Sequence, residues 1–278
     1  MSYLIPRKAK KKQRSQWFFY VTIALLAMLF LTAVLAPILS PNDPYQTDIV
    51  NQLSGPTEQY PLGTDALGRC ILSRILYGAQ TSLFSGAIIV AAVFCVGTAL
   101  GILAGYFGGI LDAIITRITT IFQAFPRMIL AIAVAGVLGI GIRNTILALC
   151  VVYWTEYARL SRSLVVGLKN RTFIKAARVC GESHLRIMVR HILPNIFPSM
   201  IVTASLDMGV MIMEISALSF LGMGVETPMA EWGEMMSAGR AYLQTNPWLI
   251  IIPGIAIFIS VMIFNLFGEK LRDRLALR

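Results

Sequence analysis

Long apolar runs of membrane-spanning length constrain the fold of this sequence more than any other feature. A helix needs about 20 apolar residues to cross the roughly 30 Å hydrocarbon core of a bilayer. Only 14% of the 278 residues are charged and 56% are hydrophobic, which leaves too little charge to coat a soluble protein of this size. We therefore expect an all-α polytopic membrane protein with six spans, at residues 17–39, 81–107, 112–138, 144–160, 195–222 and 248–267. Pro126 predicts a kink in the third span.

Basic residues predict the sidedness. Eighteen of the 24 lie before the first span, in the loop 158–194 that links the fourth and fifth spans, or after the sixth. With six spans these segments share one side, which the positive-inside tendency makes cytoplasmic. The net charge of +10 then reflects topology, and we expect no nucleic-acid partner. The expected order is a basic cytoplasmic N-terminus (1–16), a first transmembrane helix (17–39), an extracytoplasmic loop (40–80), a five-helix core (81–267) containing a cytoplasmic loop (158–194), and a cytoplasmic tail (268–278).

Motifs for catalysis and metal binding are missing from the sequence. It contains no G-x-x-x-x-G-K-[ST], H-E-x-x-H or G-x-S-x-G pattern, so we expect no catalytic residue and no cofactor in this chain. His184 and His191 would lie about 10 Å apart along a helix, too far to share one metal ion. A group of methionines could suggest a soft-metal site, but methionine is also a common packing residue. We prefer packing for Met208, Met211, Met213 and Met223, and predict no metal site.

The basic segment between the fourth and fifth spans predicts two short helices. Thr172 could cap the first (173–180), which Gly181 would end, and Ser183 could cap a second that stops at Leu193-Pro194. The second helix would carry Arg186 and Arg190 beside one apolar stripe, formed by Leu185, Met188, Val189 and Ile192. This pattern leaves two uses open. The helix could lie on the anionic leaflet of the membrane, or it could seat its stripe in a groove of another protein.

Three blocks of residues resemble the permeases of ABC importers for dipeptides, oligopeptides and nickel. The family's E-A-A-x-x-x-G…L-P loop is similar to Lys175-Ala176-Ala177 with Gly181, followed by Leu193-Pro194 at the end of the segment 191–194. The segment 62–69 with Ser73-Arg74 is similar to its L-G-T-D-x-x-G-R-D-x-x-S-R block, and a third block spans 219–273. The chain departs from the pattern at Lys175, where the family usually has Glu, and at Cys70, where it usually has Asp.

This resemblance implies a type I permease fold and a non-enzymatic subunit of an ATP-driven importer, the second or "C-type" permease of its pair. The implied partners are a homologous permease, two ATPase subunits that bind ATP and Mg²⁺, an extracytoplasmic substrate-binding protein and membrane lipid. The implied location is the inner (cytoplasmic) membrane, with both termini cytoplasmic. The family's loop would dock the ATPases through Phe173, Lys175, Ala176, Ala177, Gly181, Leu185, Arg186, Met188, Val189, Arg190 and Pro194.

The sequence also bears on the cargo and on a rival class of transporter. The motif Ala230-Glu231-Trp232-Gly233 resembles nickel permeases slightly more than peptide permeases, so nickel or a metal chelate is the first expectation, with dipeptides or oligopeptides as the alternative. A stand-alone secondary transporter is the rival from another class. It would require inverted repeats with broken helices in both halves, and none is recognised in the sequence.

Two acidic residues in the fifth span need a reason, since an acid at the bilayer centre costs about 2.5–3.5 kcal/mol. Asp207 and Glu214 would share a face with Met211, and this face could line the translocation path and contact a cationic or amine-bearing cargo. The plainer interpretation is pairing, with Arg127 or Arg117, or a hydrogen bond to a neighbouring helix. In the outer loops, we expect solvation rather than binding-protein contact for Arg69, Arg74, Glu231 and Glu234.

Overall fold

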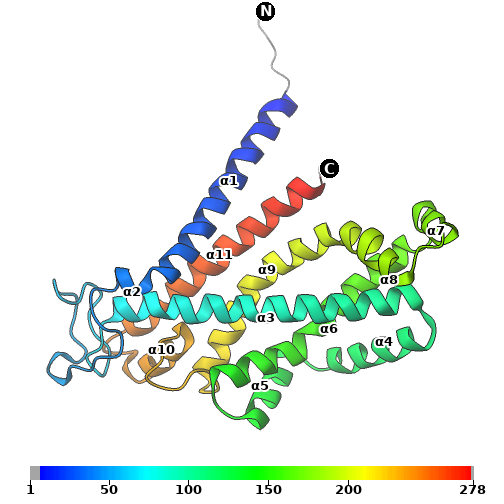
Figure 1. The fold of residues 1–278 in the computed structure, drawn as a ribbon. Coiled ribbons are helices and arrows are strands. Elements are labelled where there is room, and N and C mark those ends of the chain that lie inside the picture. Colours follow the sequence, from blue (N-terminus) through cyan, green and yellow to red (C-terminus); the bar gives the residue numbers. More distant parts are fainter. Residues whose placement is uncertain (1–6, 277–278) are drawn as a thin grey trace, which may run out of the picture.

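A computed structural model describes the backbone of residues 7–276 and the side chains of residues 17–275. This part of the chain is helical and contains no β-strand beyond one isolated bridge, between Thr64 and Cys70. Figure 1 shows the order of the elements. They are α1 (Arg7–Val34), α2 (Ala36–Leu39), η1 (Ile49–Asn51), α3 (Ile71–Phe107), α4 (Gly109–Gln123), α5 (Arg127–Leu138), α6 (Ile142–Leu168), α7 (Thr172–Val179), α8 (His184–Ile187), η2 (Met188–Ile192), α9 (Leu193–Phe220), α10 (Trp232–Gly239), η3 (Arg240–Tyr242) and α11 (Trp248–Ala276).

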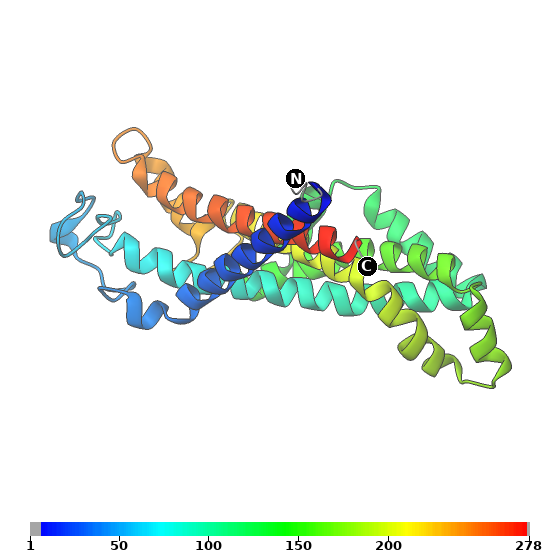
Figure 2. The same cartoon turned by 90° about the horizontal axis from the view of Figure 1, so that it is seen from above.

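The molecule is elongated along α3, and its two ends differ in composition. The loop 40–70 and α10 lie at one end, and α7 lies at the other (Figure 1). Seen from above, α1 crosses the body of the protein and packs along α11 (Figure 2). The Phe19 and Phe267 rings stack there with centroids 6.1 Å apart. The α7 end carries the basic segment between α6 and α9, so the charge asymmetry of the sequence follows the long axis.

Four helices of the described chain are long and apolar enough to cross a membrane by themselves, and a bent pair makes a fifth candidate. The four lie at 17–34, 71–107, 184–220 and 248–275, and the pair is α4 with α5. The expected kink at Pro126 is a complete break: Pro126 caps α5, and the two helices meet at 92°. Such a bend forms because proline cannot donate the backbone hydrogen bond that would continue α4. The expected fourth span corresponds to α6, whose charged residues lower its hydropathy.

Several helices extend beyond the apolar runs that predicted them. The helix of the second span begins at Ile71 rather than at residue 81, and α6 extends to Leu168. In both cases polar residues at the helix end continue the backbone hydrogen bonding outside the apolar run. Hydropathy marks the part of a helix that lies in lipid, not the helix itself.

Glycines on α3 bring it into close contact with α6. Gly97, Gly101 and Gly105 recur every four residues, so they lie on one face of α3, against α6. A Cβ atom on Gly105 would lie 2.9 Å from the carbonyl oxygen of Arg162, and one on Gly97 would lie 2.6 Å from the Cβ of Tyr157. Both distances are shorter than ordinary contact, so the two backbones touch where the glycines lie.

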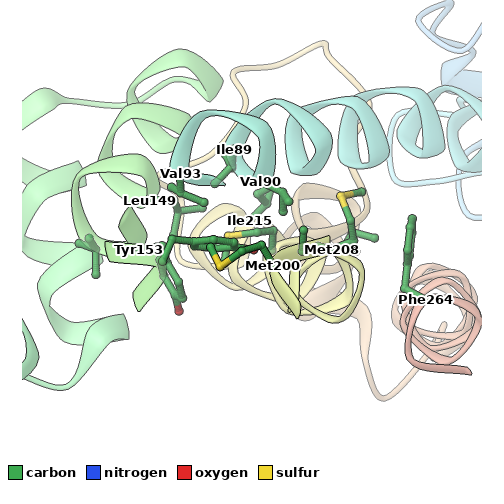
Figure 3. Close-up of a cluster of buried hydrophobic side chains, with 14 of the residues drawn as sticks. Ile89, Val90, Val93, Leu149, Tyr153, Met200, Met208, Ile215 and Phe264 are labelled. Carbon is green, nitrogen blue, oxygen red and sulfur yellow. The ribbon is translucent and has the colours of Figure 1, made fainter. Parts of the chain in front are cut away.

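The apolar core lies where α3, α6, α9 and α11 meet. Figure 3 shows Ile89, Val90 and Val93 of α3 against Leu149 and Tyr153 of α6, with Met200, Met208 and Ile215 of α9 and Phe264 of α11 beside them. Met208 and Met211 are 8% and 1% exposed. The packing role expected for these two methionines agrees with their position.

Candidate functional site: a basic loop and a polar belt

The loop between α6 and α9 folds as two helical segments, as the sequence predicts. Gly181 ends α7 with a φ of +77°, and the Glu182 N–H donates to the Ala177 carbonyl at 3.1 Å, the backbone pattern that glycine favours after a helix. The expected cap at Thr172 is wrong. Arg171 is the N-cap residue in extended conformation and Thr172 is the first helical residue, because the Arg171 carbonyl accepts from Ile174 and Lys175.

The second segment does not stop where the sequence predicts. Ser183 caps α8, and its hydroxyl accepts from the Arg186 N–H at 3.4 Å. The helix then passes through the π-helical turn η2 and continues without interruption into α9. Pro194 was expected to end it, but it lies in the first turn of α9, directly after the π-helical turn η2, and the helix continues past it. The loop is therefore directly continuous with a membrane helix.

Polar contacts attach this loop to the end of α3. The Tyr106 hydroxyl lies 2.8 Å from Nδ1 of His184, and the Arg178 guanidinium lies 5.0 Å from the centroid of the Tyr106 ring. His191 Nε2 lies 2.9 Å from the Glu182 carboxylate. The two histidines thus bind different partners in α3 and in the loop. These contacts fix the orientation of the loop relative to the membrane helices.

The apolar stripe predicted on the second helix divides between two environments. Met188 and Ile192 are buried in the core, while Leu185 and Val189 are 68% and 56% exposed. Ile187, which the stripe did not include, is fully buried. On α7, Ile174 and Ala177 face inward, and the outward face carries Phe173, Lys175, Ala176, Arg178 and Val179.

A belt of polar side chains crosses α5, α6 and α9 inside the apolar region. The Tyr157 hydroxyl donates to Asp207 at 2.6 Å, and the Tyr153 hydroxyl donates to Glu214 at 2.6 Å. Arg127 pairs with Glu156, with 2.6 Å between Nη1 and Oε2. We call these residues the polar belt: Arg127, Tyr153, Glu156, Tyr157, Asp207 and Glu214.

The polar belt provides hydrogen-bond donors for the two acids of the fifth span. A hydrogen bond to a neighbouring helix was one of the expected possibilities, and both acids make one to α6. Neither acid forms an ion pair with Arg127 or Arg117 in the described chain. Both carboxylates remain half-buried, whereas Met211 between them is in the core. Oε2 of Glu214 is buried and has no hydrogen-bond partner among the described residues.

Sequence reasoning missed the two tyrosines and Glu156 as partners. Their signal was available, since Tyr153, Glu156 and Tyr157 follow one another at intervals of three and one, which places them on one side of a helix. Each could be read alone as an interfacial or exposed residue. What the sequence could not provide was the register of α6 against α9.

Of the four charged residues expected to be solvated in the outer loops, Arg69, Arg74 and Glu231 are buried instead, and the Glu234 side chain is only 12% exposed. Arg74 is 1% exposed, and its guanidinium lies 2.9 Å from Glu234 and 3.6 Å from Asp65. Arg69 pairs with Asp65 at 2.7 Å. These groups are buried because the loop 40–70 and α10 fold over the start of α3, and ion pairing compensates their desolvation. Burial raises the pKa of Glu234, although the Arg74 charge opposes that shift.

We call Asp65, Arg69, Arg74, Glu231 and Glu234 the outer cluster. Glu231 is its most enclosed acid and is 0% exposed. Its Oε1 accepts from the hydroxyls of Ser82 and Ser216, both at 3.1 Å, and its Oε2 accepts from the Glu234 N–H at 3.0 Å. Trp232 next to it donates its indole N–H to the Ile75 carbonyl at 3.0 Å. The Ala230-Glu231-Trp232-Gly233 motif therefore fastens α10 to α3 and α9.

Comparison with known proteins places this architecture in a family. Residues 97–277 match the family described as "Binding-protein-dependent transport system inner membrane component". The dipeptide transport system permease protein DppC of Alkalihalophilus pseudofirmus is 40% identical over 269 residues, covering 97% of this chain and 88% of that protein. The nickel transport system permease protein NikC of Escherichia coli K12 is 41% identical over 261 residues, covering 94% of both chains. The glutathione transport system permease protein GsiD of Pectobacterium atrosepticum is 40% identical over 253 residues, covering 91% of this chain and 83% of that protein.

A solved structure supports the fold independently. An inward-facing crystal structure of the MetNI methionine ABC transporter superposes with a TM-score of 0.60 at 18% identity, covering 74% of this chain and 97% of that chain. At this identity the likeness concerns the fold alone. The sequence relatives carry the assignment: this chain belongs to the family of binding-protein-dependent transport system inner membrane components and is a permease subunit of an ABC importer.

Proposed function

We propose that this chain forms one half of a translocation pathway and that a homologous permease forms the other half. α6 then serves as a sixth span, since its 27 residues measure about 40 Å at 1.5 Å per residue. Six spans place both termini on the side of α7, the basic side, which is the cytoplasm by the positive-inside tendency. The start of α1 and the end of α11 point toward this side in Figure 1.

The observation that carries the proposal is the outward face of α7. Phe173 is 41% exposed and Val179 is 88% exposed, on a helix that lies at the far end of the molecule. Exposed apolar side chains beside cations are typical of a protein-binding surface. We propose that one ATPase subunit of the importer docks here, with Lys175 contacting it where the family usually presents Glu, and that a second docks on the partner permease. Each ATPase would bind ATP and Mg²⁺ itself.

Continuity of the loop with α9 supports a coupling role. A displacement of α7 would be passed along α8 and η2 to α9, and through the Tyr106–His184 contact to α3. Because α9 carries Asp207 and Glu214, motion at the docking site would move the acids of the polar belt. Closure of the ATPases would thus change access to the pathway by moving packed helices as bodies.

For the cargo we propose a small solute with a positively charged group, either a nickel complex or a short peptide. The unpartnered Oε2 of Glu214 and the half-buried carboxylate of Asp207 are the acceptors that such a group would use, with Met211 beneath them. The motif that favoured nickel over peptides is buried in the outer cluster, so it carries no preference between the two. A binding protein on the outer side would deliver the cargo.

Reconstitution tests this proposal. Liposomes containing this chain, its partner permease and the ATPase subunits should take up ⁶³Ni or a radiolabelled dipeptide from the binding protein. Uptake should require ATP on the side of the membrane where the ATPase subunits lie. The variant pair Asp207→Asn and Glu214→Gln should lower uptake while the subunits still assemble. Uptake by this chain alone, driven by an ion gradient, would instead indicate a secondary transporter.

A further inference from the structure

A groove of about 450 Å³ lies between α3 and the segment that leads from α8 into α9. One wall consists of the α3 residues Phe94, Cys95, Thr98, Ala99, Ile102 and Leu103. The other wall consists of Leu185, Met188, Val189 and Leu193. The two residues of the apolar stripe that remain exposed, Leu185 and Val189, therefore face a membrane helix of their own chain across an open space.

Contacts at both ends define the depth of this groove. At the basic end of the molecule, Tyr106 meets His184 at 2.8 Å. Farther into the apolar region, the Phe94 and Phe197 rings lie with centroids 6.1 Å apart. The two helical segments that form the walls therefore run antiparallel, with Tyr106 opposite His184 and Phe94 opposite Phe197. The α3 wall, from Phe94 to Leu103, covers nine helical steps or about 14 Å, close to the roughly 15 Å thickness of one leaflet's hydrocarbon.

Two cations lie on the same segment as the second wall of the groove. Arg186 and Arg190 each follow a groove residue directly in sequence, both are exposed, and neither guanidinium is in an ion pair within the described part of the chain. Cations near an anionic leaflet attract its headgroups. The groove thus combines a wall length that fits one acyl chain with charges that fit an anionic headgroup.

We propose that the groove binds one anionic phospholipid of the cytoplasmic leaflet, with an acyl chain between α3 and α9 and its phosphate near Arg186 and Arg190. This assigns the second half of the loop to lipid and leaves α7 as the protein-docking element. It decides between the two uses that the sequence pattern left open for 184–192. The proposal depends on the membrane placement of the chain and not on its cargo.

Photo-crosslinking in the assembled importer tests the site. The complex is reconstituted with phosphatidylglycerol carrying a diazirine on one acyl chain, or with the same analogue of phosphatidylcholine, and the labelled peptides are identified by mass spectrometry. We expect phosphatidylglycerol to label 94–103 and 185–193 preferentially. Each arginine near an anionic surface favours an anionic lipid by about fivefold, so Arg186→Gln with Arg190→Gln should reduce this preference roughly tenfold or more.

A matched pair of variants tests the groove itself. Ala99→Phe fills the groove and should abolish labelling there, whereas Ala91→Phe, at an exposed alanine of α3 outside the groove, should not. The proposal would be overturned if both lipids labelled the groove equally and the arginine substitutions did not change that labelling. It would also be overturned if the peptides were labelled in the isolated chain but protected in the assembled importer, because a protein partner would then fill the groove.

Discussion

Substitution of Gly101 by alanine is expected to separate α3 from α6. The added Cβ would lie 2.9 Å from the carbonyl carbon of Ala158, and closer still to the Ala158 oxygen and to Oγ of Ser161. Ordinary contact begins at 3.4 Å, so the helices must move apart by about 0.5 Å or more. A gap of 0.5–1 Å forfeits a quarter to a half of the dispersion energy of the contacts it opens.

Overpacking of this kind costs about 1–3 kcal/mol, and the rigid backbone of α6 places Gly101→Ala near the upper value. A loss of about 3 kcal/mol changes the unfolding equilibrium by roughly 150-fold. The assay is unfolding of the purified chain in mixed micelles with increasing SDS, followed by circular dichroism. Gly167→Ala on α6 is the control, because its Cβ would meet nothing within 4 Å and alanine favours a helix by about 0.5–1 kcal/mol. The argument is refuted if both variants are equally stable.

Three further predictions concern the acids. Glu231→Ala leaves the Ser82 and Ser216 hydroxyls without their acceptor and removes the cap of α10, so it should cost about 2–4 kcal/mol in the same unfolding assay, while Glu226→Ala at an exposed position should change little. Burial raises the pKa of Glu234 in the folded chain. The stability that Glu234 contributes is therefore full below its ordinary pKa of 4.5 and is lost as pH rises through the higher folded-state value. Thermal unfolding measured from pH 4 upward should show stability falling as pH rises, and Glu234→Gln should reduce this pH dependence. Tyr157→Phe removes the donor to Asp207 and should destabilise the chain by about 1–3 kcal/mol, and a Tyr157→Phe/Asp207→Asn double variant whose loss equals the sum of the two single losses would show that the two residues act independently.

Hydropathy was sufficient to predict the helical membrane fold, because lipid requires a long apolar run for each span. The same logic could not predict the 92° angle at Pro126. A proline indicates where backbone hydrogen bonding is interrupted, but the packing of α5 against α6 fixes the angle.

Sequence reasoning was least successful where tertiary packing decides the environment of a charge. Arg74 and Glu231 looked like loop residues, yet the loop and α10 fold over them and exclude water. Pro194 likewise looked like a helix stop, although proline is compatible with the first turn of a following helix. By contrast, Gly181 and Ser183 were predicted correctly, because their roles depend on local backbone geometry and hardly at all on distant parts of the chain.

Crosslinking at α7 tests the central proposal most directly. Cys180 follows α7 immediately and is exposed, so in the complete importer a thiol-reactive photo-crosslinker placed there should join this chain to an ATPase subunit. Phe173→Asp with Val179→Asp should abolish that product, and Ile49→Asp with Val50→Asp, at exposed apolar residues near the opposite end, should not. A crosslink to the binding protein instead, or labelling of Cys180 by an impermeant reagent added only to the outside of intact cells, would contradict the proposal.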